Sequence, residues 1–152
     1  MRKIDVLDGT LLAPLARAEG VYTDAFETTG AASLAELVGA FYTQPLFRAE
    51  RVVLAAFGAR SNDLDVAALA KGQAERFAVW RVEARRADEL LLADRFGTTM
   101  SWLSVGPRVL RFGSAVVPGR GQGLSLPVRA ILPLHRGYSR LLLAGAARRL
   151  EA

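Results

Sequence analysis

Trp80-Arg81-Val82-Glu83-Ala84-Arg85 is the stretch that decides the fold, because apolar and charged side chains alternate along it. Successive side chains of a β-strand point to opposite faces, so this pattern predicts a strand with one apolar face. Three more strand-like segments follow, separated by turn-like residues at 87–88, 96–97 and 106–107. We therefore expect a four-stranded antiparallel meander, made by residues 77–85, 90–95, 99–105 and 108–117.

The pairing register of this meander decides which residues form the core. A slip of one residue moves a whole apolar set to the other face of the sheet. Three-residue loops at the first two turns predict a single apolar wall. Its expected members are Trp80, Val82, Ala84, Leu92, Met100 and Trp102, joined by Leu110, Phe112 and Val116.

A first strand and a helix are expected before the meander. Residues 21–28 are rich in β-branched and aromatic residues and lie between Gly20 and Gly30, which predicts a strand. Ser33 followed by Glu36 is a capping-box sequence, in which each side chain satisfies a backbone N–H at a helix start. The helix is expected to run from Ser33 to about Tyr42.

Two further helices are expected before the meander. Pro45 suits the first position of a helix, and Gly58 suits its end. Between them, Leu46, Ala49, Val53 and Phe57 recur at helical spacing. A short third helix is expected from Asp63 or Asp65 to Lys71.

A final amphipathic helix is expected after the glycine-rich segment 118–123, with Pro127 and Pro133 as possible starts. Its inward stripe is predicted to be Leu134, Tyr138, Leu141, Leu142 and Gly145. The fold class is therefore α+β, with an antiparallel sheet formed by the N-terminal strand and the meander, helices after strand one, and a long C-terminal helix packed on the sheet. The 152 residues suit one domain, 1–152. The weak segments 3–7 and 123–126 are further strand candidates.

Composition excludes several kinds of site. With no cysteine, the chain has no disulfide, cysteine-ligated zinc or thiol catalysis, and a single histidine excludes a histidine-rich metal site. We expect no metal and no cofactor. The net charge of +5 comes almost entirely from arginines scattered along the chain, without the clustering typical of nucleic-acid binders, so no nucleic-acid partner is expected.

The apolar segments are too short for a membrane span. The longest, residues 52–59 and 141–147, fall far below the roughly 18 residues that a span needs. Asp5 and Asp8 interrupt the apolar run that would have to follow Arg2 and Lys3 in a signal peptide. A cytoplasmic location is therefore expected.

The order of the expected elements resembles the START-like, or helix-grip, superfamily, whose curved sheet wraps a C-terminal helix over an internal cavity. That fold commonly has more strands than we expect here. The chain is also similar to a group of short uncharacterised bacterial proteins, a resemblance that implies no activity. It is carried by the segments Tyr22-Thr-Asp24-Ala-Phe26, Phe41-Tyr-Thr-Gln-Pro-Leu-Phe-Arg-Ala-Glu-Arg51, Arg76-Phe-Ala-Val-Trp-Arg-Val-Glu83, Ser101-Trp-Leu103, Phe112-Gly-Ser-Ala-Val-Val117 and His135-Arg-Gly-Tyr-Ser-Arg140.

Trp80 and Trp102 are the first candidates for ligand binding. Both are predicted on the apolar wall beside small residues, and a large side chain next to small ones can leave a cavity. The alternative is ordinary core packing by two tryptophans. A pocket of this kind would be lined by Trp80, Trp102, Phe112 and Tyr138 and would suit a small apolar or amphipathic ligand.

Asp24 and Asp94 are candidate buried carboxylates. Asp24 shares strand parity with Tyr22 and Phe26, so it is either buried with a partner or, if the other parity faces the core, solvated. Arg48 and Arg51 share a helix face and are expected to pair with Asp24, to grip another anion, or to be solvated. Asp94 is expected on the apolar wall or at the rim of the sheet.

His135 is a candidate catalytic residue because it is the chain's one histidine and Ser139 lies one helical turn further on. The alternative is a capping or packing role. The glycines at 119, 121 and 123 lack the spacing and lysine of a phosphate-binding loop and suggest a mobile hairpin or lid.

Three functions remain open on the sequence alone. The first is a module that binds a small apolar or amphipathic molecule. The second is an enzyme of the cyclase or hydrolase type on the same scaffold, with Asp24, Asp94 or His135 as acid or base. The third is a non-catalytic interaction protein or homodimer with a filled core. A cavity would favour the first, an ionisable group inside it the second, and a solid core the third.

Overall fold

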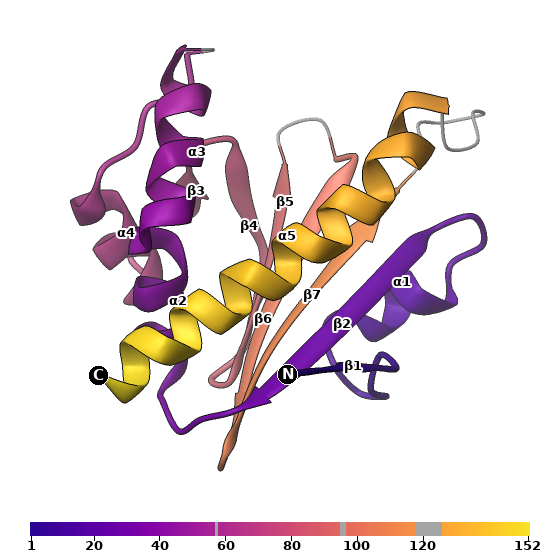
Figure 1. The fold of residues 1–152 in the computed structure, drawn as a ribbon, viewed down its shortest axis with the longest axis horizontal. Coiled ribbons are helices and arrows are strands. Elements are labelled where there is room, and N and C mark those ends of the chain that lie inside the picture. Colours follow the sequence, from indigo (N-terminus) through magenta and orange to yellow (C-terminus); the bar gives the residue numbers. More distant parts are fainter. Residues whose placement is uncertain (57, 95–96, 118–125) are drawn as a thin grey trace.

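The computed structural model of the chain describes residues 1–56, 58–94, 97–117 and 126–152, without the side chains of residues 53 and 126–137. The fold is α+β (Figure 1). Its elements, in order, are β1 (Arg2–Ile4), α1 (Ala13–Arg17), β2 (Tyr22–Thr29), α2 (Leu34–Thr43), α3 (Pro45–Ala56), α4 (Asp63–Ala70), β3 (Arg76–Phe77), β4 (Trp80–Arg85), β5 (Glu89–Asp94), β6 (Thr99–Gly106), β7 (Val109–Val116) and α5 (Leu126–Glu151).

The described strands form one antiparallel sheet in the order β1-β2-β7-β6-β5-β4-β3. The predicted meander and first strand are confirmed, because β4 to β7 pair in succession and β2 pairs with β7. The weak segment 3–7 contributes to the edge strand β1, which pairs with β2. Of the other weak segment, residues 123–125 lie outside the described part and Leu126 begins α5.

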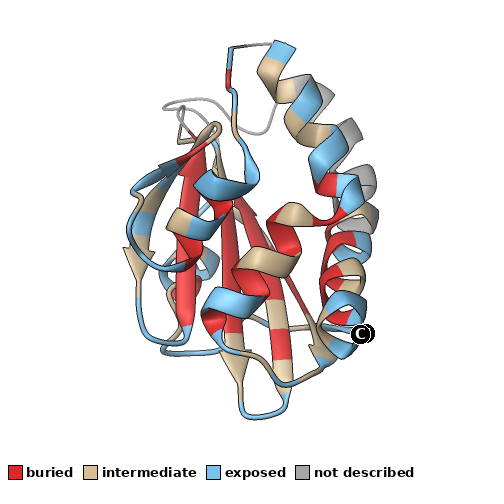
Figure 2. Cartoon of the chain, turned by 90° about the vertical axis from the view of Figure 1, so that its left-hand side faces the viewer, coloured by how far each residue is buried: buried red, intermediate tan, exposed pale blue. Residues whose placement is uncertain are grey.

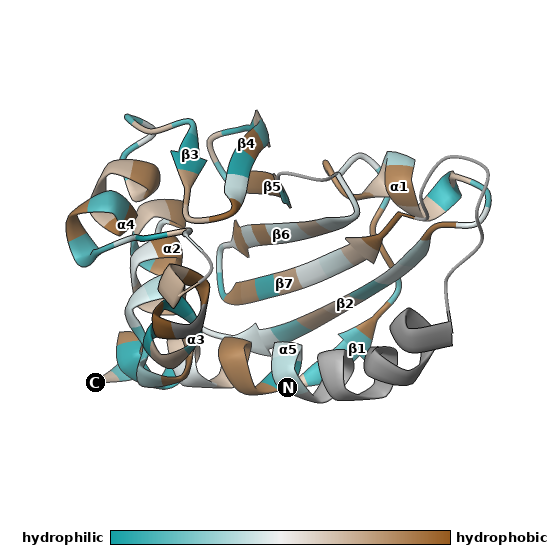
Figure 3. Cartoon of the chain, turned by 90° about the horizontal axis from the view of Figure 1, so that it is seen from above, coloured by the Kyte–Doolittle hydropathy of each residue, from teal (hydrophilic) through white to brown (hydrophobic). Residues whose placement is uncertain are grey.

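Helices cover both faces of this sheet. We call the face under α2 and α5 the inner face and the opposite face, covered by α1, the outer face. Leucines and aromatic residues of the inner face pack with α2 and α5 in the larger core, and Leu12 and Trp102 belong to a smaller core on the outer face. Figure 2 shows buried residues of α5 turned toward the sheet, and Figure 3 shows β6, β7 and β2 between α5 and α1.

The predicted apolar wall is wrong for strand β6. A three-residue loop pairs residues of the same parity, whereas the structure pairs Leu92 with Ser101. This register turns Ser101 to the inner face with Leu92, and it turns Met100 and Trp102 to the outer face. One residue in the connection therefore exchanges the two faces of the strand.

Ala84 also lies on the other face than predicted. The β4–β5 register shifts between Val82 and Ala84, so that Val82 pairs with Leu92 and Ala84 pairs with Leu91. Such a bulge places one unpaired residue in the strand and reverses the facing of those that follow. Trp80 and Val82 consequently pack on the larger core, and Ala84 packs on the smaller one.

Helix α5 packs on the sheet as predicted but with a different stripe. Leu142, Leu143 and Ala146 are buried, whereas Leu141 is 60% exposed. The prediction that Leu141 points inward is wrong, and the side chain of Leu134 lies outside the described part. Because α5 begins at Leu126, beside the candidate start Pro127, the other candidate start at Pro133 lies within the helix.

Gln44 and Gly145 fix where α5 crosses the junction of α2 and α3. The buried Gln44 amide donates to the Phe41 carbonyl at 2.9 Å and to the Leu142 carbonyl at 2.8 Å. A Cβ on Gly145 would lie 2.2 Å from Gln44 Oε1, so only glycine permits this approach. The two helices are thus joined through one buried amide.

We expect Leu143→Asp to unfold the domain and Leu141→Asp to change its stability by less than about 0.5 kcal/mol. Leu143 is 0% exposed, so the aspartate charge would enter the core unpaired, whereas at position 141 it would remain in water. Chemical denaturation of the two variants measures the difference. Equal loss of stability in both would contradict the packing of α5.

We expect Ser33→Ala to lower the free energy of unfolding by about 1 kcal/mol. The predicted capping box is present: the Glu36 backbone N–H donates to Ser33 Oγ at 3.2 Å, and the Ser33 N–H donates to Glu36 Oε2 at 2.7 Å. Urea titration of the variant and the parent protein gives the difference. A change near zero would show that the cap does not stabilise α2.

Candidate functional site

A cavity of about 220 Å³ lies between the inner face of the sheet and the helices α2, α3 and α5. Trp80 of β4, Phe112 of β7 and Tyr138 of α5 are among its walls, so three of the predicted pocket residues meet there. Its aromatic lining consists of Phe41, Tyr42, Phe47, Trp80, Phe112 and Tyr138. Its polar lining includes Glu50, Thr99, Ser101 and Ser139.

The aromatic walls are held by contacts with one another. Phe41 stacks on Phe112 with ring centroids 4.7 Å apart, which joins α2 to the sheet. Tyr42 packs edge-on against Phe47 at 4.7 Å and Phe77 at 5.2 Å. Offset and edge-to-face arrangements of this kind are the favourable ones for aromatic pairs, so these walls are well defined.

Glu50 and two tyrosines form the polar end of the cavity. The Tyr138 hydroxyl donates a hydrogen bond to Glu50 Oε2. Burial raises the pKa of the Glu50 carboxyl, and the Tyr138 hydrogen bond partly opposes that rise. Burial also raises the pKa of both tyrosine hydroxyls, and the Glu50 charge adds to the rise. Both phenols therefore keep their protons at neutral pH and can donate hydrogen bonds.

Two buried donors in the cavity wall have no hydrogen-bond partner among the described residues. One is the hydroxyl of Tyr42, a residue only 1% exposed, and the other is the indole N–H of Trp80. A buried polar group without a partner costs about 1–3 kcal/mol, so such groups are rare in folded proteins. The Tyr42 hydroxyl can donate or accept a hydrogen bond, and the Trp80 N–H can donate one, so both groups are open to a polar ligand.

A row of polar side chains crosses the inner face beside the cavity. Asp24, Ser114 and Ser101 are direct neighbours on β2, β7 and β6. Asp24 is 2% exposed, and Ser114 Oγ donates to its Oδ1 at 2.5 Å, while its Oδ2 has no partner among the described residues. The prediction of a buried Asp24 is confirmed, and its functional role stays a prediction.

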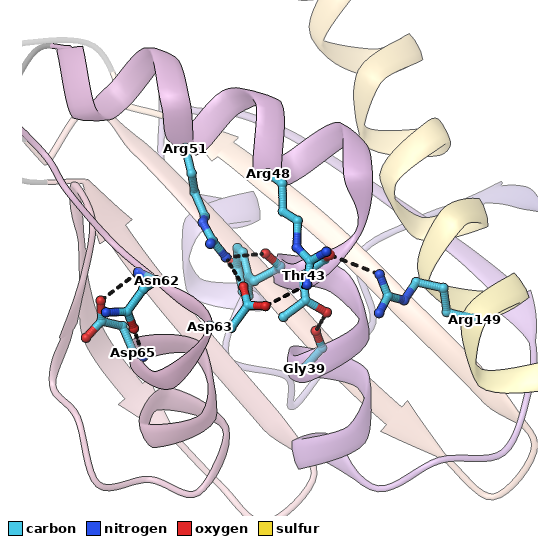
Figure 4. Close-up of polar contacts among 9 residues, drawn as sticks. Gly39, Thr43, Arg48, Arg51, Asn62, Asp63, Asp65 and Arg149 are labelled. Carbon is cyan, nitrogen blue, oxygen red and sulfur yellow. Dashed lines mark hydrogen bonds and ion pairs between the residues drawn. The ribbon is translucent and has the colours of Figure 1, made fainter.

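Arg48 and Arg51 do not pair with Asp24, so that prediction is wrong. Both arginines of α3 reach Asp63 at the start of α4, Arg48 at 2.6 Å and Arg51 at 2.8 Å (Figure 4). The Arg51 hydrogen bond is the main reason why the pKa of Asp63 is lowered, and Arg48 adds to the effect. The two cations therefore join helices α3 and α4, and their binding of a ligand anion stays a prediction.

Asp94 organises the β5–β6 turn. Its carboxylate accepts hydrogen bonds from the backbone and hydroxyl of Thr98, at 2.9 and 2.7 Å, and from the Thr99 hydroxyl at 2.9 Å. Asp94 is buried, as one alternative predicted, but these turn contacts account for its burial. It does not line the cavity.

Trp102 is not part of the cavity, so its prediction as a wall beside Trp80 is wrong. It is 0% exposed on the outer face, and its indole N–H donates to Glu89 Oε2 at 2.7 Å. The Leu11 N–H donates to the same oxygen at 2.8 Å, which fixes the segment before α1. Gly113 is required here, because a Cβ would lie 2.9 Å from the Trp102 ring and 2.7 Å from Leu12.

Sequence reasoning missed Tyr42, Glu50, Ser101 and Ser114 as candidate site residues. The signal for the two serines depends on the pairing register. Ser101 pairs with Leu92 and Ser114 pairs with Asp24, so both serines lie on the inner face. Tyr42 and Glu50 gave no signal, since aromatic and charged residues are common on amphipathic helices. The side chain of His135 and the glycine-rich segment 118–123 lie outside the described residues.

The chain matches no protein-family model, no curated protein and no solved structure. Within the described residues, no group of three His, Asp or Glu side chains is placed to hold a metal ion. No helix in the described ranges combines the length and the apolar character needed to cross a membrane.

We expect Asp63→Asn to lower stability near neutral pH by well under about 1 kcal/mol, since the Asp63 side chain is 49% exposed and water screens both ion pairs. The folded-state pKa of Asp63 is lowered, so its contribution is present above the unfolded-state pKa. It is lost as pH falls through the lowered folded-state pKa. Urea titrations from pH 7 downward should therefore converge for variant and parent protein, and a difference independent of pH would contradict the ion pairs.

Proposed function

We propose that this protein is a binding module that holds a small amphipathic molecule in the inner-face cavity. The observation that carries the proposal is a cavity with aromatic walls in which the Tyr42 hydroxyl and the Trp80 N–H lack partners. Ligand sites in proteins typically combine apolar walls with a few placed polar groups. These unpartnered groups indicate that the ligand carries a polar group able to form hydrogen bonds.

The size of the cavity favours a single-ring compound. An apolar cavity of about 150 Å³ holds benzene, and this cavity measures about 220 Å³. A ring with a short polar substituent matches that space and the polar end formed by Glu50 and Tyr138. A longer ligand would have to extend out of the cavity beyond its described walls.

The arrangement of α5 supports a helix-grip-like scaffold for this function. The helix packs on β2 and β7, and Tyr138 and Leu142 lie over the cavity. The resemblance to the START-like superfamily is part of the proposal and rests on this arrangement and on the sequence motifs. The cytoplasmic location and the homodimer stay predictions from the sequence.

Catalysis is the second candidate, because one observation favours it: Glu50 brings an ionisable group to the cavity wall. Asp24 and Asp94, which the sequence predicted as acid or base, support catalysis less. Asp94 is engaged by the β5–β6 turn, and Asp24 does not line the cavity. The interaction protein with a filled core is the weakest candidate, because the cavity leaves the core incompletely filled.

We expect the fluorescence emission of Trp80, and not that of Trp102, to change when a ligand binds. Benzyl alcohol entering the cavity should shift tryptophan emission and raise the thermal midpoint by selective binding to the folded state. In Trp80→Phe the remaining tryptophan lies on the outer face, so emission should no longer respond, and loss of the indole N–H should weaken binding severalfold. The half-buried position of Trp80 makes this variant tolerable for folding.

Native mass spectrometry of freshly purified protein is the complementary test, because a co-purified molecule would identify the ligand directly. A panel of neutral and positively charged single-ring compounds that all leave both emission and thermal midpoint unchanged would refute the pocket. Emission that still responds in Trp80→Phe would place the ligand elsewhere.

A further inference from the structure

The Glu50 carboxyl has no cation beside it among the described residues. Its described partner is the neutral Tyr138 hydroxyl. The adjacent cation, Arg51, is bound to Asp63. A half-buried carboxylate beside aromatic rings is poorly hydrated, so a positive charge supplied by a ligand would stabilise it. The raised pKa of Glu50 has the same cause.

The walls of the cavity also suit a cation. The faces of aromatic rings attract ammonium groups, with tryptophan and tyrosine among the strongest partners. Tyr42 and Trp80 are both wall residues, and the Tyr42 hydroxyl oxygen is free to accept a hydrogen bond from an ammonium N–H. Tyr42 also lies close enough to Glu50 for the carboxylate charge to raise the pKa of its hydroxyl.

We propose that the ligand is a small primary amine, with its ammonium group at Glu50 and Tyr42 and its apolar part against Phe41 and Phe112. This inference rests on the proposed binding function and specifies the charge of the ligand. The Glu50 carboxylate supplies the opposite charge, and the Tyr42 oxygen accepts one N–H. The stacked Phe41 and Phe112 rings provide the apolar surface.

The direct test compares benzylamine with benzyl alcohol by isothermal titration calorimetry at neutral pH. The two compounds have nearly the same size and ring, but only benzylamine is positively charged. We expect benzylamine to bind at least about tenfold more tightly, since hydrogen bonds between charged groups are roughly twice as strong as neutral ones.

Glu50→Gln tests the carboxylate itself. The amide keeps the shape and can still accept from Tyr138, but it carries no charge. We expect the preference for benzylamine to fall to within about twofold of benzyl alcohol, whose own affinity should not change. Glu75→Gln is the matched control, because Glu75 is exposed and does not line the cavity. It removes the same charge from the protein and should keep the full preference.

Tyr42→Phe separates binding from folding. Removing a buried hydroxyl without a described partner should leave the thermal midpoint unchanged or raise it. Benzylamine affinity should nevertheless fall severalfold, because the ammonium loses an acceptor. A fall in stability with unchanged benzylamine affinity would mean that Tyr42 is purely structural and would overturn its part in the site.

Three outcomes distinguish this inference from the binding function on which it rests. Tighter binding of benzylamine that Glu50→Gln abolishes supports both. Equal affinity for the two compounds, or a preference that survives in Glu50→Gln, overturns the amine and leaves the binding function standing. No binding of either compound overturns the amine inference and counts against the pocket as well.

Discussion

The close crossing of α5 over the α2–α3 junction is the contact on which the rest of the structure depends. Gln44 donates one amide group to carbonyls of α2 and of α5, and Gly145 leaves no room for a side chain between them. A buried amide satisfied on both sides is costly to separate, so the height of α5 above the sheet is set there. Tyr138 and Leu142 of the same helix line the cavity.

The charged residues of this protein divide into those that build the fold and those that face the cavity. Arg48 and Arg51 join α3 to α4 through Asp63, and Asp94 holds a turn. These charged groups have partners within the protein, so neither their burial nor their closeness to one another indicates a ligand. Glu50 differs because its described partner is a neutral phenol. A carboxylate without a cation among the described residues, in an aromatic pocket, is a better pointer to function than the number of charges nearby.

The two tryptophans have different surroundings because they lie on opposite faces of one sheet. Trp102 packs with Leu12 and donates to Glu89, which closes the outer face. Trp80 stands at the cavity, with its N–H free of any described partner. Substitutions at the two tryptophans are therefore expected to act independently, since residues of opposite strand parity share few contacts.

Local sequence patterns determined the α+β class, the order of strands β4 to β7 and the start of α2, because alternation, proline, glycine and the Ser33–Glu36 pair act over a few residues. They did not determine which strand face meets α5. The connection before Thr99 and the bulge after Val82 each shift the facing by one residue, so Trp102 and Ala84 left the predicted wall and Ser101 joined it. The meeting of Glu50 and Tyr42 with Tyr138 was likewise decided by tertiary structure. It requires α5 to lie beside α2 and α3 over the sheet, and no local pattern encodes the distance between helices that are so far apart in the chain.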